Sequence, residues 1–416
     1  VKLQRFFLFG KESYAFLIDE AHNLPDRARG MYSAALSLKP VVETRRSIPK
    51  QDRKQPLYKS LKALEKAISA CFEGLQSPVS RRDAPRSLSA DVEATLDRLS
   101  EESTAADPAL ARELAFSLSA FRYILEQYDE NYLTLYEGGK TTRRITLFCA
   151  DPSEKLAAAC KKIRSTILFS ATLTPYAFCK NLSGLSAQTP VLSLPSPFPP
   201  EHLAVFHLPA DLRYNAREAT LPAVADAVRA FVSARTHGNY LVFAPSHAYL
   251  SKLAPLLSER LPDVTLIEQS PRMDDAARAG FLSQFQPDPA GVTVGLAVMG
   301  GVFSEGIDLP AERLCGAVVI GVGLPQLCLE RDVLRDAYEE KYAQGYSYAY
   351  QYPGLCKVLQ ASGRIIRNGT DRGALLLVDR RYGCAEYRGL LPTQWNVRRV
   401  RSLSQMTDAL QRFWSE

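Results

Sequence analysis

Long apolar runs and closely spaced cysteines are both missing from this sequence. No segment approaches the ~18 consecutive apolar residues that span a bilayer, which predicts that this is not a membrane protein. Each of the eight cysteines lies eleven or more residues from the next. This spacing excludes a CxxC-type zinc or ferredoxin-like site and favours buried free thiols in a reducing cytosol.

An initiator methionine is missing too, because the chain begins with Val1. The first residues also lack the apolar core and cleavage site of a signal peptide. We therefore expect the chain to have been cut from a longer one.

The composition is that of a globular protein. The 416 residues are enough for two or three domains with buried cores. Hydrophobic residues make up 46% and charged residues 23% of the chain, which is ordinary for this class. A net charge of +6 with a pI of about 8.8 permits a polyanionic partner without requiring one.

Buried parallel strands are predicted near the start of the chain and again after residue 164. Residues 14–18 are continuously apolar, and residues 165–170 have an apolar centre at residues 167–169, which is typical of strands covered on both faces. Between them, residues 25–164 look mostly helical. Leucines recur at helical spacing over residues 57–72 and 110–125, the second helix opening on an Asp107 cap, and residues 132–149 predict a hairpin.

Strands and helices alternate after a proline-rich linker at residues 194–200. Strands are predicted at residues 240–243, 264–267, 292–298, 316–320 and 374–378. The helices between them include residues 223–234, 275–285 and 355–367. Such alternation predicts an α/β fold in which helices cover both faces of a parallel sheet.

An acidic loop follows the first predicted strand, where residues 19–22 read DEAH. The carboxyl edge of a parallel sheet is where α/β proteins bind ligands. Phosphoryl transfer needs one carboxylate to hold Mg²⁺ through water and a neighbour to orient or deprotonate the attacking water. Asp19 suits the first role and Glu20 the second. The alternative is a helix N-terminus that merely carries acids.

Two further loops follow predicted strands. Residues 170–173 read SATL, and their hydroxyls can contact the acidic loop and sense a γ-phosphate; alternatively, they only cap a helix. Residues 300–308 begin with two glycines, which let backbone approach a ligand. Glu305 and Asp308 add acceptors there for ribose, water or an arginine, and the alternative is a sharp turn.

The predicted helix over residues 355–367 carries two arginines. Gln360, Arg364 and Arg367 stand at i, i+4 and i+7, so one helical face would present all three. Planar guanidinium groups suit a γ-phosphate, although a solvated basic face is the alternative. Gly363 would cost about 1 kcal/mol inside a helix relative to alanine, which argues against a purely structural role.

The order of these motifs resembles motifs II, III, V and VI of superfamily 2 helicases, with residues 243–246 where motif IV belongs. Within that superfamily the chain resembles the DinG/XPD group of iron–sulfur helicases. The resemblance rests on residues 19–24, 168–173, 196–198, 304–308 and 360–367. It is strengthened by the long insertion between motifs II and III, where this group carries a helical arch.

The resemblance implies RecA-like motor domains with an arch insertion. Residues 1–24 and 165–200 would belong to the first motor domain, 25–164 to the arch and 201–416 to the second. The implied catalytic residues are Glu20, Gln360, Arg364 and Arg367. The implied nucleotide contacts are Asp19 (also holding Mg²⁺ through water), His22, Ser170, Thr172, Glu305, Gly306 and Asp308.

The implied activity is ATP-dependent, 5′-to-3′ unwinding of DNA at single strands and forks, in the bacterial cytoplasm near the nucleoid. One departure stands out: the phosphate loop G-x-x-x-x-G-K-[ST] is absent from these residues. The chain alone is therefore not expected to hydrolyse ATP. A [4Fe–4S] cluster is expected only in the full-length parent. A non-enzymatic DNA- or protein-binding module is the rival, and an RNA helicase is a third alternative.

Basic residues cluster in the predicted arch, over residues 39–62, and again at residues 398–401. Arg45, Arg46, Arg53 and Lys54 are candidate contacts to a DNA backbone, and a solvated face is the alternative. Four tyrosines between residues 346 and 352 either stack on bases or pack on their own domain.

Overall fold

The computed structural model describes residues 14–101, 106–303, 309 and 313–415. The chain divides into two compact units. The N-terminal unit comprises Val1–Pro190 and Gln326–Ala349, and the C-terminal unit comprises Val191–Pro325 and Tyr350–Glu416. The segment 326–349 thus groups with the N-terminal unit, although the sequence analysis assigned it to a domain over 201–416. The predicted domain boundaries stay a prediction.

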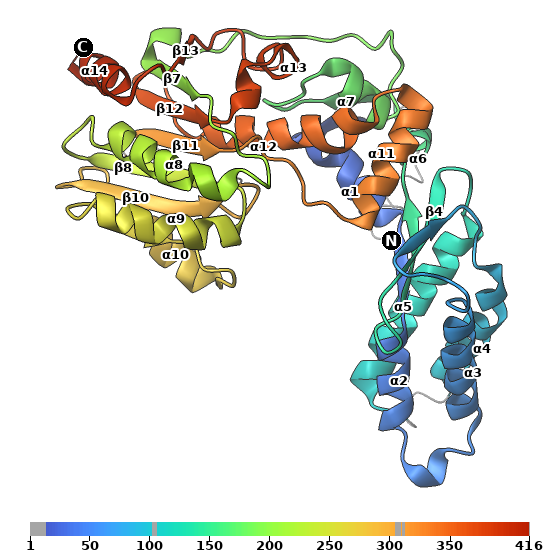
Figure 1. Ribbon diagram of the computed structural model, residues 1–416. Coiled ribbons are helices and arrows are strands. Elements are labelled where there is room, and N and C mark those ends of the chain that lie inside the picture. The colour runs from blue at the N-terminus through green and yellow to red at the C-terminus, as the bar shows by residue number, and fades with distance from the viewer. Residues whose placement is uncertain (1–13, 102–105, 304–308, 310–312, 416) are drawn as a thin grey trace. The chain divides into compact units, whose positions relative to one another are not determined.

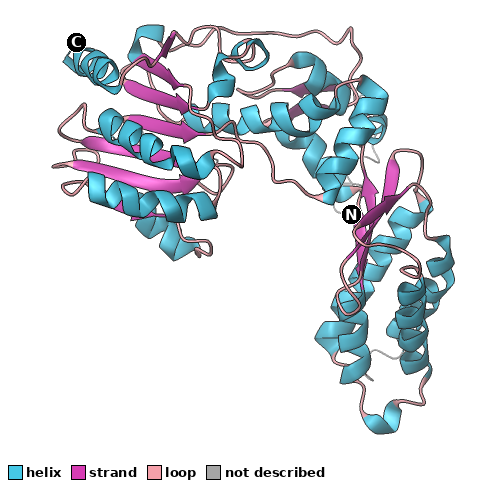
Figure 2. Ribbon diagram, viewed as in Figure 1, coloured by secondary structure: helices cyan, strands magenta, loops and turns pink. Residues whose placement is uncertain are grey.

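The C-terminal unit is built on a seven-stranded sheet in which every pair is parallel. Its order is β13-β7-β12-β11-β8-β10-β9, and Figure 2 shows these strands in magenta. The strands are β7 (Leu203–Leu208), β8 (Gly238–Ala244), β9 (Thr265–Glu268), β10 (Val292–Val298), β11 (Gly316–Ile320), β12 (Gly373–Val378) and β13 (Val397–Arg399). The α/β fold class predicted from the sequence is confirmed.

Helices cover both faces of this sheet, because successive strand residues point to opposite sides. Tyr240 and Val242 of β8 enter one core, which is closed by α8 (Arg217–Val232), α9 (His247–Arg260) and α14 (Leu403–Ser415). Leu241 and Phe243 enter the other core, which is closed by α10 (Asp275–Ser283), α12 (Tyr352–Ser362) and α13 (Ala385–Arg388). The five predicted strands are present here, and β7 and β13 are additional.

The N-terminal unit contains a small parallel sheet of two strands, β1 (Ala15–Ile18) and β6 (Ser165–Leu168). They are the two strands predicted on either side of the helical region. Their expected burial is not observed, since Leu17 is 69% and Ile167 is 54% exposed. These two residues pair in register, so one face of the sheet is open among the described residues.

Much of the insertion between these strands is a domain of helices α2 to α5 and an antiparallel sheet (Figure 1). The helices are α2 (Leu38–Ser47), α3 (Pro56–Ala70), α4 (Ser89–Glu101) and α5 (Pro108–Glu126). The sheet has the order β2-β5-β4-β3, with β2 (Ala34–Ser37), β3 (Val79–Arg81), β4 (Tyr132–Glu137) and β5 (Arg144–Cys149). The predicted hairpin is β4–β5. The Asp107 carboxylate caps α5 by accepting from the amides of Ala109 and Leu110.

Four more helices complete this unit: α1 (Leu24–Met31), α6 (Ser153–Cys160), α7 (Tyr176–Leu182) and α11 (Leu329–Tyr342). Helix α11 comes from far along the chain, yet Tyr338 on it is buried and its hydroxyl accepts from Arg29 on α1 at 2.5 Å. None of the helices in the described part of the chain is long and apolar enough to cross a membrane.

Candidate functional site

The acidic loop and the hydroxyl loop meet at the edge of the two-stranded sheet. Strands β1 and β6 are parallel and in register, so their carboxyl ends lie at the same edge, and residues 19–22 stand beside residues 169–172. The amide of Ala21 donates to the carbonyl of Phe169 at 3.2 Å. The sequence allowed a contact between these two loops without predicting which strands pair, and the Ser170 hydroxyl does contact the Glu20 carboxylate.

Four predicted site residues share one polar network. His22 is nearly buried, and its Nδ1 lies 2.8 Å from the Ser170 hydroxyl and 3.2 Å from the Glu20 carboxylate. The Ser170 hydroxyl also lies 3.2 Å from Glu20 Oε2 and 3.3 Å from the hydroxyl of buried Thr172. Any change that moves the Glu20 carboxylate therefore alters contacts of the hydroxyl loop.

Glu20 holds an unusual backbone conformation. Its φ of 48° and ψ of 41° lie in the left-handed region, which costs a non-glycine residue on the order of 1 kcal/mol and is concentrated at functional sites. The Glu20 amide donates to the Asp19 carboxylate at 2.7 Å. Both acidic residues are exposed, with 61% of the Glu20 side chain accessible. The two carboxylates thus sit on a fixed turn and face solvent.

Oxygen ligands of this kind fit Mg²⁺, which commonly keeps several waters and takes one or two carboxylates plus phosphate oxygens. Within the described ranges no group of three or more His, Cys, Asp or Glu side chains is placed to hold a metal. The water-mediated Mg²⁺ contact through Asp19 stays a prediction.

The double-glycine loop after β10 makes a sharp turn, which the sequence analysis gave as the alternative to a ligand-binding loop. Gly300 has a φ of +74°, and a Cβ on it would lie 2.9 Å from the Lys357 side chain. The amide of Gly301 donates back to the carbonyl of Val298. The remaining candidates of this loop, Glu305, Gly306 and Asp308, lie outside the described residues.

The predicted helix over residues 355–367 ends earlier than expected. Helix α12 stops at Ser362, with Gly363 as its C-cap, so Arg364 and Arg367 follow the helix instead of sharing a helical face with Gln360. Single i-to-i+3 turns replace the helix there. The Asp371 carboxylate accepts the amides of Arg367 and Asn368, which holds the chain in a turn. Gly363 thus marks a helix end, so its position no longer argues for function.

Ile365 explains why the helix must stop. It is 1% exposed, and a Cβ on Gly373 of β12 would lie 2.0 Å from its Cγ2. The chain turns at Gly363 so that Ile365 packs against this strand. Gln360, Arg364 and Arg367 belong to the C-terminal unit and the acidic loop to the N-terminal unit, so a nucleotide site formed by both sets stays a prediction.

The candidate DNA contacts of the arch differ among themselves. Arg45 is 19% exposed and is held by Glu65 at 2.8 Å and by the Tyr58 hydroxyl at 3.0 Å, so its first role is to join α2 to α3. Arg46, Arg53 and Lys54 are exposed. Contact of these three side chains with a DNA backbone stays a prediction.

The tyrosine-rich segment packs on its own unit in part. Tyr348 and Tyr350 are 5% and 4% exposed. Tyr348 packs against Phe178 and Tyr338 with ring centroids 5.0 and 5.8 Å apart, and its hydroxyl accepts from Asn181. Tyr348 thus packs in the protein interior, but on residues 178 and 181, which were assigned to the first motor domain, and not on the domain over 201–416.

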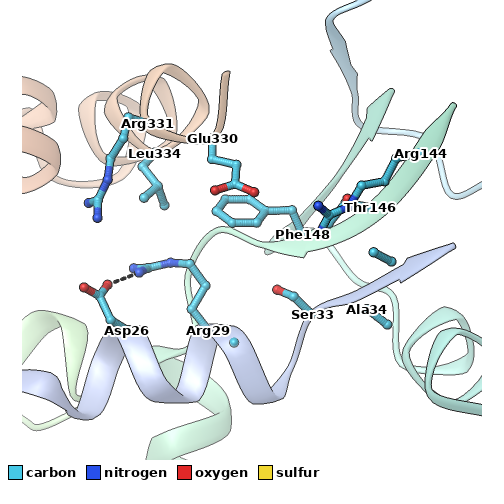
Figure 3. Close-up of a pocket in the computed structure, with 12 residues that line it drawn as sticks. Asp26, Arg29, Ser33, Ala34, Arg144, Thr146, Phe148, Glu330, Arg331 and Leu334 are labelled. Atoms are coloured by element: carbon cyan, nitrogen blue, oxygen red, sulfur yellow. Dashed lines mark hydrogen bonds and ion pairs between the residues drawn. The ribbon is translucent and has the colours of Figure 1, made fainter. Parts of the chain in front are cut away.

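The sequence did not predict a set of hydrogen bonds and ion pairs that connects α11 to the arch insertion; we call this set the polar joint. Asp151 accepts from Lys341 at 2.6 Å and from the Tyr342 hydroxyl at 3.1 Å, and Arg82 pairs with Glu340. Nearer its start, α11 lines a pocket with Glu330, Arg331 and Leu334 (Figure 3). The alternation of residues along β5 indicates that one of its faces lies outside the arch core. Nothing in the sequence indicates that α11 packs near that face.

Comparison with known proteins supplies a family context. A family model described as a helicase C-terminal domain matches residues 230–398. The ATP-dependent DNA helicase CHL1 of Eremothecium gossypii is 22% identical over 95% of this chain and 56% of its own length. The XPD helicase subunit of the general transcription and DNA repair factor IIH of Schizosaccharomyces pombe is 22% identical over 66% of this chain and 38% of its own length.

The chain thus spans about half or less of the length of these relatives. A solved structure of XPD in its apo form superposes with a TM-score of 0.64 at 16% identity, covering 96% of this chain and 79% of the other. At that identity the likeness establishes the fold alone. It agrees with the α/β architecture described above.

Proposed function

We propose that this chain belongs to the DinG/XPD-type family of superfamily 2 helicases, with which its helicase C-terminal domain and its similarity to CHL1 and XPD agree, and that the protein carrying it is an ATP-dependent DNA helicase. We infer that it acts on single-stranded and forked DNA and moves 5′ to 3′. The polarity follows from the family resemblance. The observation that carries the proposal is the shared network of Glu20, His22 and Ser170 at the carboxyl edge of β1 and β6.

The network suits the hydrolytic half of the reaction. Glu20 would orient and deprotonate the attacking water, because its exposed carboxylate is held on a fixed turn. The Ser170 hydroxyl and the His22 ring, both in contact with that carboxylate, would report its position to the hydroxyl loop. Asp19 would hold Mg²⁺ through water, and the ion supplies charge neutralisation on the phosphates when bound.

The C-terminal unit would supply cations for the transferred phosphoryl group. Arg364 and Arg367 are planar donors suited to spreading phosphate charge, and Gln360 precedes them on α12. Because α12 ends at Ser362, Arg364 and Arg367 lie in the turn that follows it and do not share a helical face with Gln360. Glu305, Gly306 and Asp308 are proposed to couple this unit to the nucleotide.

The test is Glu20→Gln in the complete protein that contains this chain, with Glu259→Gln as a matched control on the exposed surface of α9. Steady-state ATP turnover is measured with and without a poly-dT oligonucleotide. Loss of a general base costs typically 10²–10⁴-fold, so we expect turnover to fall by about 100-fold or more while nucleotide binding persists. Control turnover should not change.

Two results would count against the proposal in different ways. If the Glu20 variant turns over ATP within a few-fold of the unchanged protein, Glu20 is not the general base. Absence of any DNA-stimulated turnover in the unchanged protein would favour the rival, a non-enzymatic DNA- or protein-binding module. The rival is supported by the lack of a phosphate loop within these 416 residues, for which reason we expect them to show no turnover when expressed alone.

A further inference from the structure

A pocket of 430 Å³ opens within the N-terminal unit, between α1, β2, β5 and α11 (Figure 3). We propose that it binds a backbone phosphate of single-stranded DNA. The DNA source of the phosphate rests on the proposed function; the affinity of the pocket for phosphate rests on its own side chains. None of these side chains belongs to the acidic loop or to the motifs of the C-terminal unit.

The pocket is lined by the face of β5 that points away from the arch core. Side chains alternate along a strand, so Ile145, Leu147 and Cys149 enter that core, whereas Arg144, Thr146 and Phe148 line the pocket. Figure 3 shows Glu330, Arg331 and Leu334 of α11 on the opposite side, and Arg29 of α1 between the two walls.

Two buried donors that line the pocket have no acceptor among the described residues. Thr146 is 4% exposed, and its hydroxyl has no hydrogen-bond partner among the residues that the structure describes. Arg29 is 6% exposed, and its Nε is equally unsatisfied within the described part of the chain. A buried polar atom without a partner is costly and is rare in native proteins. Both atoms belong to side chains that line the pocket, which points to a ligand that accepts hydrogen bonds.

The Ser33 hydroxyl is a third donor, oriented by a backbone amide. The Ser33 hydroxyl accepts from the amide of Cys149 at 3.0 Å, so its own proton is directed elsewhere. Since Ser33 lines the same pocket, its hydroxyl can donate to the same ligand as Thr146. Hydroxyl and guanidinium donors together are the set that recognises phosphate oxygens.

The charges of the lining favour an anion. Three arginines face two acids, Asp26 and Glu330, and Asp26 already pairs with Arg29. Burial works against the charge of Arg29, but Tyr338 and Asp26 outweigh burial and raise its pKa above the ordinary value. Arg29 therefore stays cationic at the base of the pocket. Arg144 on the rim is exposed and is free to approach a strand from solvent.

The experiment measures equilibrium binding of a fluorescent oligo-dT to the 416-residue chain by anisotropy, without ATP. Thr146→Val keeps the shape and the β-branch but removes the unsatisfied hydroxyl. We expect the melting temperature to be unchanged or higher and the affinity to fall about tenfold, since hydrogen bonds to charged groups are worth roughly one order of magnitude in binding. A structural role for the hydroxyl would instead lower the melting temperature.

Arg144→Gln is the second variant, with Arg112→Gln at an exposed position of α5 as the matched control. Loss of one phosphate contact should weaken binding and reduce the slope of log affinity against log salt by about one. The control should leave both unchanged. Affinities of the Thr146 and Arg144 variants within twofold of the unchanged chain would overturn the proposal.

Competition with inorganic phosphate separates the two sources of the ligand. If phosphate binds with the same dependence on Thr146 and Arg144, while oligo-dT binding ignores both, the pocket takes a free anion and the DNA assignment is wrong. If the unchanged chain binds no oligo-dT at all, the DNA partner of the proposed function fails as well. Binding that is intact but indifferent to both variants refutes the pocket alone.

Discussion

Replacing Asp151 by asparagine should loosen α11 from the arch insertion. Asp151 follows β5 and is 5% exposed. Its Oδ2 accepts from Lys341 at 2.6 Å and from the Tyr342 hydroxyl at 3.1 Å, and its Oδ1 accepts from the amide of Ser153 at 2.9 Å. Asparagine keeps the size of the side chain and removes its charge, so the change isolates the ionic part of this joint.

The expected loss is about 1–2 kcal/mol. Hydrogen bonds to charged groups contribute roughly 1.5–3 kcal/mol, and the Lys341 side chain is 38% exposed, so solvent screening places the loss toward the lower end. Burial alone would raise the pKa of Asp151, but the hydrogen bonds from Lys341 and Ser153 outweigh it and hold the pKa below the ordinary value.

This direction of the pKa shift predicts a pH dependence. A carboxyl group whose folded-state pKa is lowered stabilises the protein at pH values above its unfolded pKa of about 4, and this stabilisation is lost as the pH falls through the folded value. The stability difference between the unchanged chain and Asp151→Asn should therefore be complete at pH 7. It should narrow progressively below about pH 4.

Hydrogen exchange with peptide-level mass spectrometry measures this loss where it occurs. Amides of α11 and of the segment after β5 should exchange faster in the variant. Both tryptophans, Trp395 and Trp414, lie in the C-terminal unit, so their fluorescence in urea serves as an internal control that should not change. Glu218→Gln, which breaks an exposed ion pair with Lys252, is the matched variant. Unchanged exchange in α11, or an effect that persists undiminished at pH 3, would refute the reasoning.

Two further outcomes follow from the C-terminal unit. In the complete protein, Arg367→Ala should lower ATP turnover about 10³-fold with little change in nucleotide or DNA affinity, because arginine fingers act mainly in the transition state. Turnover within a few-fold of the unchanged protein would mean that this arginine is structural. Gly373→Ala should destabilise the unit by about 1–3 kcal/mol in urea unfolding followed by tryptophan fluorescence, because its methyl group would overlap Ile365. An unchanged midpoint would mean that Ile365 moves aside freely.

The strands of the large sheet were largely predictable from local sequence. Strands β10 and β11 match their predicted bounds, since continuous apolar runs between turns identify strands buried on both faces. Strand β7 was missed because it follows a proline-rich stretch and contains His207, and β13 because it is short and carries two arginines. Both segments become strands because they pair with neighbouring strands of the sheet. The local sequence pattern does not reveal such pairing.

The candidate site was predictable only where neighbouring strands impose proximity. Parallel pairing of β1 with β6 was enough to bring Glu20 and Ser170 together. The end of α12 was misread because a glycine inside an apolar period looks like a helix interior until Ile365 is seen against β12. The contact of Arg29 with Tyr338 joins positions 309 residues apart, and no local periodicity encodes such a pairing.

That separation also sets an order of events during synthesis. Arg29 leaves the ribosome long before Tyr338, and at roughly 5–20 residues per second the wait is about 15–60 s. Throughout it the surface that α11 will cover stays open, while residues 191–325 of the other unit are already being made. The C-terminal sheet waits too, because β12 and β13 follow α11 in the chain. Until α11 has been made, the nascent chain therefore holds two incomplete cores. The N-terminal unit, whose last segment ends at Ala349, can then finish folding before the C-terminal sheet does.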